Sequence, residues 1–256
     1  MSTGGDERTA EIAANLEAVR ARIDGACRAA GRDPAKITLV VVTKTYPAAD
    51  VIRLASLGVR EVGENRDQEA AGKAAEVAAA GVGVRWHFVG QLQRNKCRSV
   101  VRYASMVHSV DSVRLAQTLS QAAVRHTGEA DGLARRGLPG GLECLVQVSL
   151  DGDPQRGGAI VDERHGEDLA LDRVLAAIAA AESLSLRGLM AVAPLEWEPE
   201  RAFATLAAIA ARVRTEYPGA TILSAGMSDD VEQAIRHGAT HVRMGTAVLG
   251  VRSRLM

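Results

Sequence analysis

The sequence predicts an α/β protein that folds as a single (β/α)8 TIM barrel with an extra helix at its N-terminus. Three observations predict this fold. Eight short apolar runs alternate with helical patterns, one further helical pattern precedes the first run, and the length of 256 residues suits one barrel. A doubly wound open sheet is the alternative, but it requires a glycine-rich turn after an early strand. The first strand ends instead in Thr43-Lys44-Thr45-Tyr46-Pro47, so we favour the barrel.

The first periodic segment runs from Arg8 to Ala30 and predicts the leading helix. Its apolar residues recur at spacings of four, three, four and four, which place them on one helical face. Gly31 is expected to end this helix. The preceding residues 1–7 are polar, and we expect them to be disordered. The apolar residues of the helix are Ile12, Leu16, Val19, Ile23 and Cys27.

The remaining elements follow from short apolar runs, which predict buried strands, and from longer periodic segments between them, which predict helices. Pro47 suits the first position of a helix, and Gly58 and Gly238 suit helix ends. The predicted strands are 37–43, 59–62, 84–89, 106–110, 143–149, 186–191, 221–224 and 240–244. The predicted helices between them are 47–57, 65–80, 94–102, 111–124, 167–182, 199–216 and 228–237.

One segment interrupts this alternation. Residues 126–141 contain five glycines and one proline with few apolar side chains, so we expect a surface insertion between a helix and the fifth strand. The barrel is predicted to occupy residues 8–250, and residues 251–256 are predicted to form a C-terminal tail.

Composition argues against several classes of protein. The 31 basic and 31 acidic residues give no net charge, which disfavours a nucleic-acid binder with a broad cationic surface. No apolar run approaches the length of a membrane span, and the polar N-terminus lacks the features of a signal peptide. The three cysteines and six histidines show neither disulfide nor metal-ligand spacing, so we expect no metal and a cytoplasmic location.

Lys44 is the first candidate for chemistry. Only four of the 31 basic residues are lysines, and this one closes an apolar strand. A guanidinium stays protonated in proteins, whereas a desolvated ammonium can lose its proton and attack a carbonyl carbon. A Schiff base at Lys44 is therefore the most natural covalent chemistry. The alternative is an ordinary solvated lysine just past a strand.

Two small-residue turns indicate a phosphate site. They are Ser224-Ala225-Gly226-Met227-Ser228 after the seventh strand and Gly245-Thr246 after the eighth. Barrels often bind phosphate between these two loops, where backbone N–H groups, hydroxyls and a helix N-terminus meet the anion. The alternative is two ordinary turns that cap helices. The occurrence of both turns at these positions favours phosphate.

Arg243 ends the eighth strand, and a permanent cation there would favour an unprotonated nitrogen in an aromatic heterocycle. If the ligand were pyridoxal phosphate, this would weaken its ring as an electron sink. The alternative is an arginine at the barrel rim paired with a carboxylate. His87 lies in the apolar third strand, where a histidine with a satisfied core role is the commoner case.

Seven motifs carry a resemblance to a known family over roughly residues 8–250. They are Val42-Thr43-Lys44-Thr45-Tyr46-Pro47, Gly63-Glu64-Asn65, Trp86 to Lys96, His108-Ser109-Val110-Asp111, Arg187-Gly188-Leu189-Met190-Ala191, Ser224 to Asp230 and Val242-Arg243-Met244-Gly245-Thr246. In combination they resemble the pyridoxal phosphate homeostasis proteins, whose fold is that of the N-terminal barrel of alanine racemase, fold type III.

The resemblance implies a set of cofactor-binding residues. Lys44 would bear pyridoxal 5′-phosphate as an internal aldimine, and Arg243 would face the pyridine nitrogen. Ser224, Gly245 and Thr246 would hold the phosphate, and Asn65 would line the ring pocket. His87 and Lys96 lie in family motifs, but the resemblance assigns neither a role.

The chain also departs from the family pattern. Members often carry a lysine in the loop after the fifth strand, where this chain has Arg156. Arginine could bind a phosphate there but could not form an imine. Ala225 stands where the family commonly has a bulkier methionine, and the insertion at 126–141 is longer than in typical members.

The resemblance implies a non-catalytic carrier of pyridoxal phosphate in vitamin B6 homeostasis, and apo-enzymes that need the cofactor would be its recipients. A pyridoxal-phosphate racemase or decarboxylase is the alternative. Such enzymes add a β-domain and a second base, and no segment or motif here suits either, which also favours a monomer. A phosphosugar barrel with Lys44 as an aldolase-type lysine ranks last, because aldolase lysines more usually sit later in the barrel.

Overall fold

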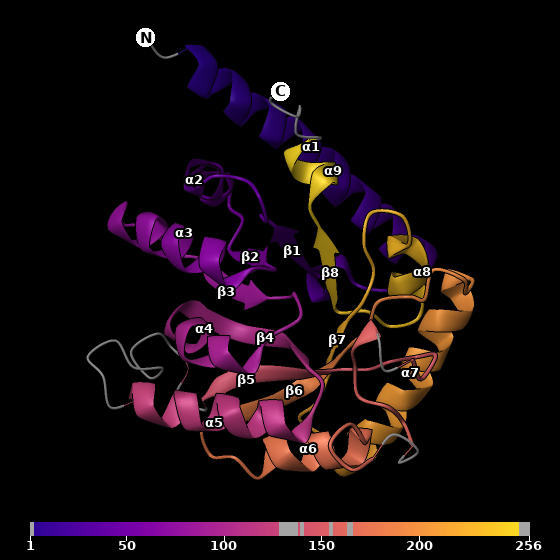
Figure 1. The fold of residues 1–256 in the computed structure, drawn as a ribbon. Coiled ribbons are helices and arrows are strands. Elements are labelled where there is room, and N and C mark those ends of the chain that lie inside the picture. The colour runs from indigo at the N-terminus through magenta and orange to yellow at the C-terminus, as the bar shows by residue number, and fades with distance from the viewer. Residues whose placement is uncertain (1–2, 128–137, 139–140, 154–155, 163–165, 251–256) are drawn as a thin grey trace.

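The computed structural model describes residues 3–127, 138, 141–153, 156–162 and 166–250. It shows a closed barrel of parallel strands in sequence order, with β8 paired to β1, which confirms the predicted fold (Figure 1). The strands are β1 (Thr38–Val42), β2 (Glu61–Glu64), β3 (Arg85–Phe88), β4 (Ala104–Val110), β5 (Leu142–Gln147), β6 (Leu184–Met190), β7 (Ile222–Ser224) and β8 (His241–Met244).

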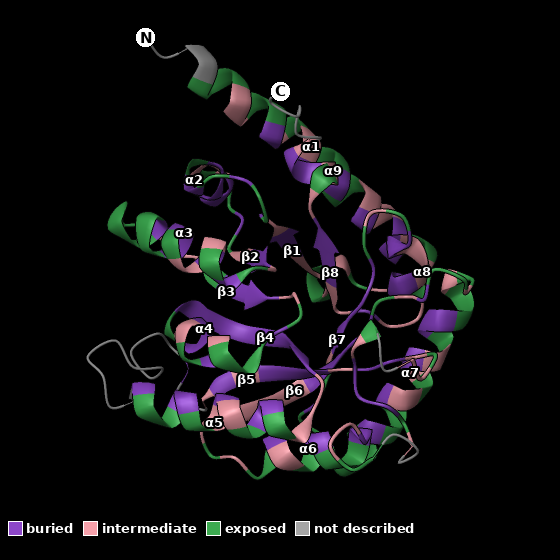
Figure 2. Ribbon diagram, in the orientation of Figure 1, coloured by how far each residue is buried: buried purple, intermediate pink, exposed green. Residues whose placement is uncertain are grey.

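Helices surround the barrel and turn their buried residues toward the strands, with exposed residues on the outer side (Figure 2). Two short 3₁₀ helices, Pro34–Lys36 and Arg94–Lys96, precede β1 and α4. The α-helices are α1 (Thr3–Ala29), α2 (Ala48–Ser56), α3 (Asp67–Ala79), α4 (Cys97–Tyr103), α5 (Val113–Thr127), α6 (Leu171–Ala179), α7 (Pro199–Glu216), α8 (Val231–Arg236) and α9 (Thr246–Leu249).

The leading helix packs along the outside of the barrel, beside α8 and α9 (Figure 1). All five apolar residues of its predicted face are buried, which confirms that face. Arg22 on α1 forms a two-pronged ion pair with Glu232 on α8 and so fixes the helix from outside. The helix begins at Thr3 rather than Arg8. It therefore includes residues 3–7, for which the sequence predicts disorder. Acidic Asp6 in the first turn suits a helix N-terminus.

One strand lies later in the chain than its apolar pattern predicts. Val59 does not start β2, because its N–H closes the turn after α2 by donating to the carbonyl of Leu54. The strand instead runs from Glu61 to Glu64. Acidic residues disfavour a strand by propensity, but Glu64 is neutralised by Lys73 in the layer between β2 and α3. Tertiary pairing therefore overrides the local signal here.

Most of the predicted insertion lies outside the described residues, at 128–137 and 139–140, and so does the predicted tail at 251–256. Helix α5 continues to Thr127, and Leu138 is buried and accepts a hydrogen bond from the N–H of Gly141. The boundaries of the barrel domain stay predictions.

The barrel interior is divided between apolar and polar side chains. Met106, Leu145 and Met190, from β4, β5 and β6, form a small cluster separate from the main core between strands and helices. Barrel interiors are usually filled by layers of branched apolar residues. In this barrel, buried His87, His108 and other polar side chains occupy part of the interior.

The sequence also predicts no membrane-spanning helix, no metal site and no disulfide framework, and the described residues can be compared with each expectation. None of the described helices is long and apolar enough to cross a bilayer. Over the same ranges, no group of three or more His, Cys, Asp or Glu side chains is arranged to hold a metal ion. Each of the three cysteines is buried and free.

Candidate functional site

The predicted cofactor residues all come from four consecutive strands of the closed barrel, β7, β8, β1 and β2. Each lies at the carboxyl end of its strand or just after it, on the face of the barrel where such folds place their sites. The six residues are Lys44 after β1, Asn65 after β2, Ser224 at the end of β7, Arg243 in β8, and Gly245 and Thr246 after β8.

Strand register brings two of these residues to the same level. Val42 on β1 pairs with Gly63 on β2. Lys44 and Asn65, each two residues further along, therefore leave adjacent strands side by side. Gly63 also keeps this junction compact, because an added Cβ would lie 3.2 Å from a methyl of Val40.

Lys44 sits in a sharp turn between β1 and α2. Its side chain is exposed, and within the described residues its ammonium makes no hydrogen bond or ion pair. The next residue, Thr45, has a φ of 67°, in the left-handed region that non-glycine residues rarely adopt. Its N–H lies 3.3 Å from Oε2 of Glu69. The turn is therefore held by α3 while the amine stays available for a ligand.

A buried ion pair underlies this turn, and sequence reasoning missed it. Nζ of Lys73 on α3 lies 2.5 Å from Oε1 of Glu64 and 2.7 Å from the carbonyl oxygen of Thr43. The hydroxyl of Thr43 donates to the same carboxylate oxygen over 2.6 Å. Lys73 shares its buried helix face with apolar Ala70 and Val77, and that position among apolar residues was the available signal.

Asn65 contributes an unsatisfied acceptor. Its Oδ1 is buried and has no hydrogen-bond partner among the described residues. A buried polar atom without a hydrogen bond destabilises the folded protein unless a ligand or water supplies the missing partner. The backbone of Asn65 is pressed against Gly90 after β3, where an added Cβ would lie 2.3 Å from the Asn65 carbonyl oxygen. Glycine at this position lets the two loops meet.

Gly245 and Thr246 lie where β8 passes into α9. An added Cβ on Gly245 would lie 3.2 Å from the carbonyl oxygen of Val42, so this turn runs close against the end of β1. Across the described chain, the N–H groups of Gly245 and Thr246 donate to no backbone or side-chain acceptor. These free donors fit an anion, as predicted for a phosphate.

Arg243 is buried in the barrel interior. Its Nη1 donates to Oγ of Ser224 over 2.7 Å, and its Nη2 donates to the carbonyl of Ala191 over 3.0 Å. Desolvation lowers the pKa of Arg243 to about 10, while the charge of Asp230 raises it. The guanidinium therefore stays charged at neutral pH. No carboxylate within the described residues forms an ion pair with it, unlike the rim arginine of the alternative interpretation.

Ser224 is positioned differently from a simple phosphate ligand. It is fully buried, and its Oγ lies 2.9 Å from Nδ1 of His108 in addition to accepting from Arg243. Its role toward phosphate stays a prediction. Sequence reasoning did not anticipate the contact with His108, because the two residues are 116 positions apart in the chain.

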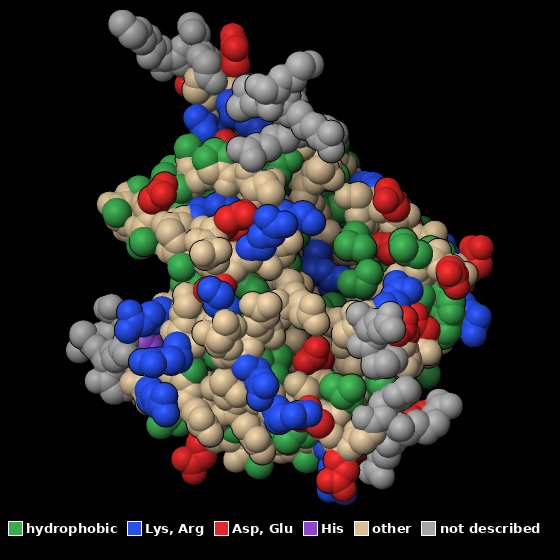
Figure 3. Space-filling view, viewed as in Figure 1, with side chains coloured by type: hydrophobic (Ala, Val, Ile, Leu, Met, Phe, Trp, Pro, Cys, Tyr) green, Lys and Arg blue, Asp and Glu red, His purple; other side chains and the backbone are tan. Residues whose placement is uncertain are grey.

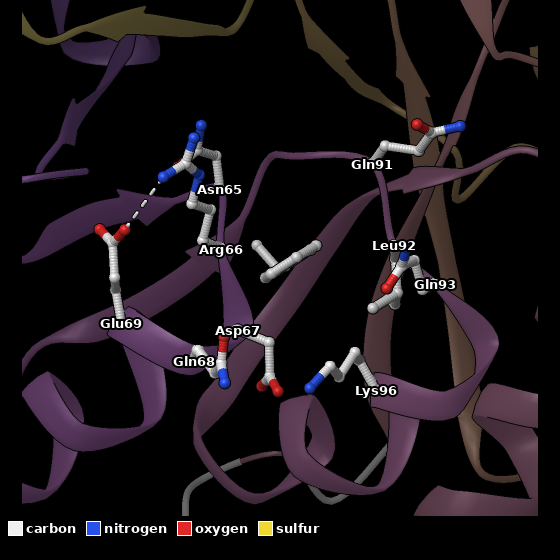
Figure 4. A pocket seen from close by; sticks show the side chains of 10 residues that line it. Asn65, Arg66, Asp67, Gln68, Glu69, Gln91, Leu92, Gln93 and Lys96 are labelled. Atoms are coloured by element: carbon white, nitrogen blue, oxygen red, sulfur yellow. Dashed lines mark hydrogen bonds and ion pairs between the residues drawn. The ribbon is translucent and has the colours of Figure 1, made fainter.

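The face toward the viewer in Figure 3 is hollowed near its middle, with a basic side chain visible at the floor of the hollow. Beside the barrel rim lies a cavity of about 340 Å³ between the loops that follow β2 and β3. In Figure 4, Lys96 points toward Asp67 across this cavity, while Asn65 and Gln91 lie at its other end. Lys96, which has no predicted role, thus belongs to the neighbourhood of the site.

The loop after β5 reaches the same region. Arg156 is exposed and pairs with Asp151 over 3.3 Å. At the adjoining Gly157, an added Cβ would lie 3.7 Å from side-chain atoms of Asp111 and Gln91. The position at which family members often carry a lysine is therefore close to the barrel mouth, but here it carries an arginine in an ion pair.

Comparison with known proteins identifies the family of this chain. The family described as alanine racemase, N-terminal domain, matches residues 14–253. The pyridoxal phosphate homeostasis protein of Mycobacterium tuberculosis (strain ATCC 25618 / H37Rv) is 47% identical over 254 residues, covering 96% of this chain and 95% of that protein. The protein of the same name from Escherichia coli (strain K12) is 37% identical over 246 residues, covering 94% and 97%.

Solved structures show the same barrel. PipY of Synechococcus elongatus PCC7942, in a structure with PLP bound, has a TM-score of 0.73 at 32% identity, covering 93% of this chain and all of that chain. An alanine racemase from Corynebacterium glutamicum has a TM-score of 0.63 at 15% identity, covering 97% of this chain and 64% of that one, which shows the fold alone. The chain therefore belongs to the pyridoxal phosphate homeostasis protein family, built on the alanine racemase N-terminal barrel.

Proposed function

We propose that this protein binds pyridoxal 5′-phosphate at the barrel mouth and holds it for delivery, without catalysing a reaction of its own. The observation that carries the proposal is the pair of cationic groups at the carboxyl ends of two adjacent strands: an amine without a described partner at Lys44, just after β1, and the buried guanidinium of Arg243 in β8. The relative PipY, whose structure contains PLP, supports the choice of cofactor.

Four of the predicted residues offer groups that suit parts of the cofactor. When bound, the cofactor supplies an aldehyde that can condense with a primary amine and release water. Lys44 offers the only exposed amine of the turn, and Asn65 offers a buried acceptor without a partner. The N–H groups of Gly245 and Thr246 suit the phosphate. These groups together bind both ends of one small molecule.

The charge on Arg243 favours holding over turnover. A guanidinium beside the ring nitrogen disfavours protonation of that nitrogen, because like charges repel. An unprotonated ring withdraws electrons poorly, and strong electron withdrawal is what carbanion chemistry on this cofactor requires. The buried Arg243 thus suits a carrier better than a decarboxylase.

Each candidate for a second catalytic base is either held in hydrogen bonds with other residues or lies far from the barrel mouth. A racemase needs such a base opposite the lysine. Tyr46 is buried and its hydroxyl donates to the carbonyl of Gly250 over 2.5 Å. His87 is bound on both ring nitrogens. Tyr217 follows α7, whose end lies at the opposite face of the barrel from the strand carboxyl ends.

Absorption spectroscopy tests the binding. We expect the purified protein to bind added pyridoxal 5′-phosphate with a new visible band that sodium borohydride removes, and Lys44→Ala to lack that band. Lys36→Ala, which changes an exposed lysine away from the mouth, should keep it. A band that survives in Lys44→Ala would count against the assignment.

In this proposal the protein is a monomer, and apo-enzymes that need the cofactor are its recipients. A second pair of assays tests the carrier role. Loaded protein should restore activity to an apo-enzyme that depends on pyridoxal phosphate, in a gel-filtered mixture without free cofactor. The same preparation should not racemise or decarboxylate amino acids. Sustained turnover in the second assay would place the protein among the enzymes instead.

A further inference from the structure

A line of hydrogen bonds crosses the barrel interior from its floor to its mouth. At the floor, Oε2 of Glu61, the first residue of β2, lies 2.5 Å from Nε2 of His87 on β3. Nδ1 of His87 lies 2.8 Å from Nε2 of His108 on β4. Nδ1 of His108 lies 2.9 Å from Oγ of Ser224, which accepts from Arg243 over 2.7 Å. Five side chains from five strands are thus joined end to end.

This line is sealed along most of its length. His87 is 1% exposed, and His108 and Ser224 are fully buried. The carboxylate side chain of Glu61 is 20% exposed, so water reaches the line at the floor. At the other end, Arg243 is 6% exposed and belongs to the proposed cofactor site. The two histidines can therefore exchange hydrogens only with each other, with Glu61 at the floor and with Ser224 beside the cofactor site.

The two ends fix the direction of every bond when both histidines are neutral. Arg243 can only donate, and an ionised Glu61 can only accept. Ser224 must then give its hydrogen to Nδ1 of His108. His108 carries its hydrogen on Nε2 and gives it to Nδ1 of His87, whose own Nε2–H binds Glu61. Each donor has one acceptor, and the Ser224 hydroxyl hydrogen points inward.

One added proton reverses the inner bonds. If a proton enters at Ser224, the hydroxyl hydrogen moves to Nδ1 of His108, and the Nε2 hydrogen of His108 moves to Nδ1 of His87. The positive charge comes to rest on His87 beside the Glu61 carboxylate. Ser224 then accepts from His108 and from Arg243, and its new hydrogen is free to point to the mouth.

We propose that Glu61, His87 and His108 are positioning residues that couple phosphate binding at Ser224 to the uptake of a proton by the buried line. The inference rests on the proposed function, since it takes the phosphate of pyridoxal phosphate as the group that Ser224 meets. A phosphate oxygen can only accept from Ser224 when the hydroxyl hydrogen points to the mouth, which is the reversed arrangement. Above the second pKa of the phosphate, which is about 6, the phosphate arrives without its last proton, so the added proton comes from solvent.

The surrounding charges fit the storage of a cation at His87. On β8, His241 has its ring centroid 6.3 Å from that of His87, and burial lowers the pKa of His241 to about 4, so it stays neutral. Arg85 lies 3.7 Å from Glu61, but it also pairs with Glu143, which in turn pairs with Arg187. Near the other end, Asp230 acts on Arg243. Desolvation raises the pKa of Glu61, but the hydrogen bond from His87 and the neighbouring charge of Arg85 outweigh it, so the pKa is lowered.

The variant Glu61→Gln distinguishes proton coupling from a purely structural role of Glu61. An amide can donate as well as accept, so a glutamine could donate to Nε2 of a neutral His87 whose hydrogen is on Nδ1. The reversed arrangement would then need no extra proton. Glu143→Gln is the matched control, because Glu143 is a similarly exposed acid that pairs with Arg85 but does not touch His87.

Calorimetric titration of the full-length protein with pyridoxal 5′-phosphate, in buffers of different ionisation enthalpy, counts the protons taken up on binding. We expect Glu61→Gln to take up about one proton fewer than wild type at the same pH, and Glu143→Gln to match wild type. An unchanged count in Glu61→Gln, with binding intact, overturns the relay. Absence of binding by wild type would instead overturn the proposed function.

Nitrogen NMR of the histidine rings gives a second measurement that needs no variant. We expect His108 to carry its hydrogen on Nε2 in the ligand-free protein and on Nδ1 once the cofactor is bound. A His108 that keeps its hydrogen on Nε2 in both states would overturn the proposal even if Glu61→Gln failed to fold.

Discussion

The ammonium of Lys73 lies 2.5 Å from Oε1 of Glu64, and this buried pair also holds the carbonyl of Thr43, the residue before Lys44. Lys73 is 7% exposed and Glu64 is fully buried. The second carboxylate oxygen of Glu64 has no partner among the described residues. Without Lys73, the buried carboxylate of Glu64 would have no compensating charge. The turn that carries Lys44 would also lose the hydrogen bond that Lys73 donates to Thr43.

Replacement of Lys73 by methionine should leave Glu64 as an uncompensated buried charge. We expect a loss of about 3–5 kcal/mol in the free energy of unfolding, measured by urea denaturation at pH 7. The control is Lys36→Met at an exposed position, with a change of no more than about 0.5 kcal/mol. Equal stability of the two variants would show that the buried pair is not needed.

Buried neutral histidines predict a loss of stability in mild acid. Burial lowers the pKa of His241 to about 4 and lowers that of His108 well below its ordinary value. The unfolded chain therefore binds more protons than the folded one between about pH 6.5 and 4.5. Stability should fall as pH falls through this range, by up to about 1.4 kcal/mol per pH unit for each such group.

Urea denaturation at several pH values between 4.5 and 6.5 measures this slope. His241→Asn should flatten it, because asparagine carries no group that titrates over this range. A wild-type protein whose stability is constant over the range would contradict the neutral state of the buried rings.

The close contact between the loops after β2 and β3 predicts that a single methyl group at Gly90 lowers both stability and cofactor affinity. In Gly90→Ala, the new Cβ would lie 2.3 Å from the carbonyl oxygen of Asn65, so one loop must move. We expect destabilisation of about 1–3 kcal/mol, as for other overpacked sites, and weaker binding of pyridoxal phosphate through the displaced Asn65. Thermal unfolding and spectroscopic titration measure the two effects.

Gly83→Ala is the matched control for that substitution, because no heavy atom lies within 4 Å of an added Cβ there. It should change neither stability nor binding appreciably. Should Gly90→Ala bind the cofactor as tightly as Gly83→Ala, the position of the Asn65 loop would have no part in the site.

The sequence alone predicts the barrel because its signals are local. The alternation of apolar runs with periodic segments identifies every strand, and the scarcity of lysine singles out Lys44. The start of β2 is wrong by two residues because Val59 is buried in a turn rather than a strand. Apolar character reports burial, but it does not distinguish a turn from a strand.

The internal polar contacts could not be predicted in this way. His87 and His108 each have an ordinary strand context, and only the closed barrel brings them together. Glu64 and Lys73 are likewise joined by the packing of α3 against β2. Such pairs depend on the side-chain directions of separate elements, which periodicity does not specify. The contact between His87 and His108 also explains why the interior of this barrel carries polar residues.

Mapping the site of covalent attachment tests the central claim most directly. Protein loaded with pyridoxal 5′-phosphate is reduced with sodium borohydride, digested and analysed by mass spectrometry across all four lysines. We predict the pyridoxyl label on Lys44 and its absence from Lys36, Lys73 and Lys96. A label on Lys96, which borders the neighbouring cavity, or an even spread over the exposed lysines would contradict the account.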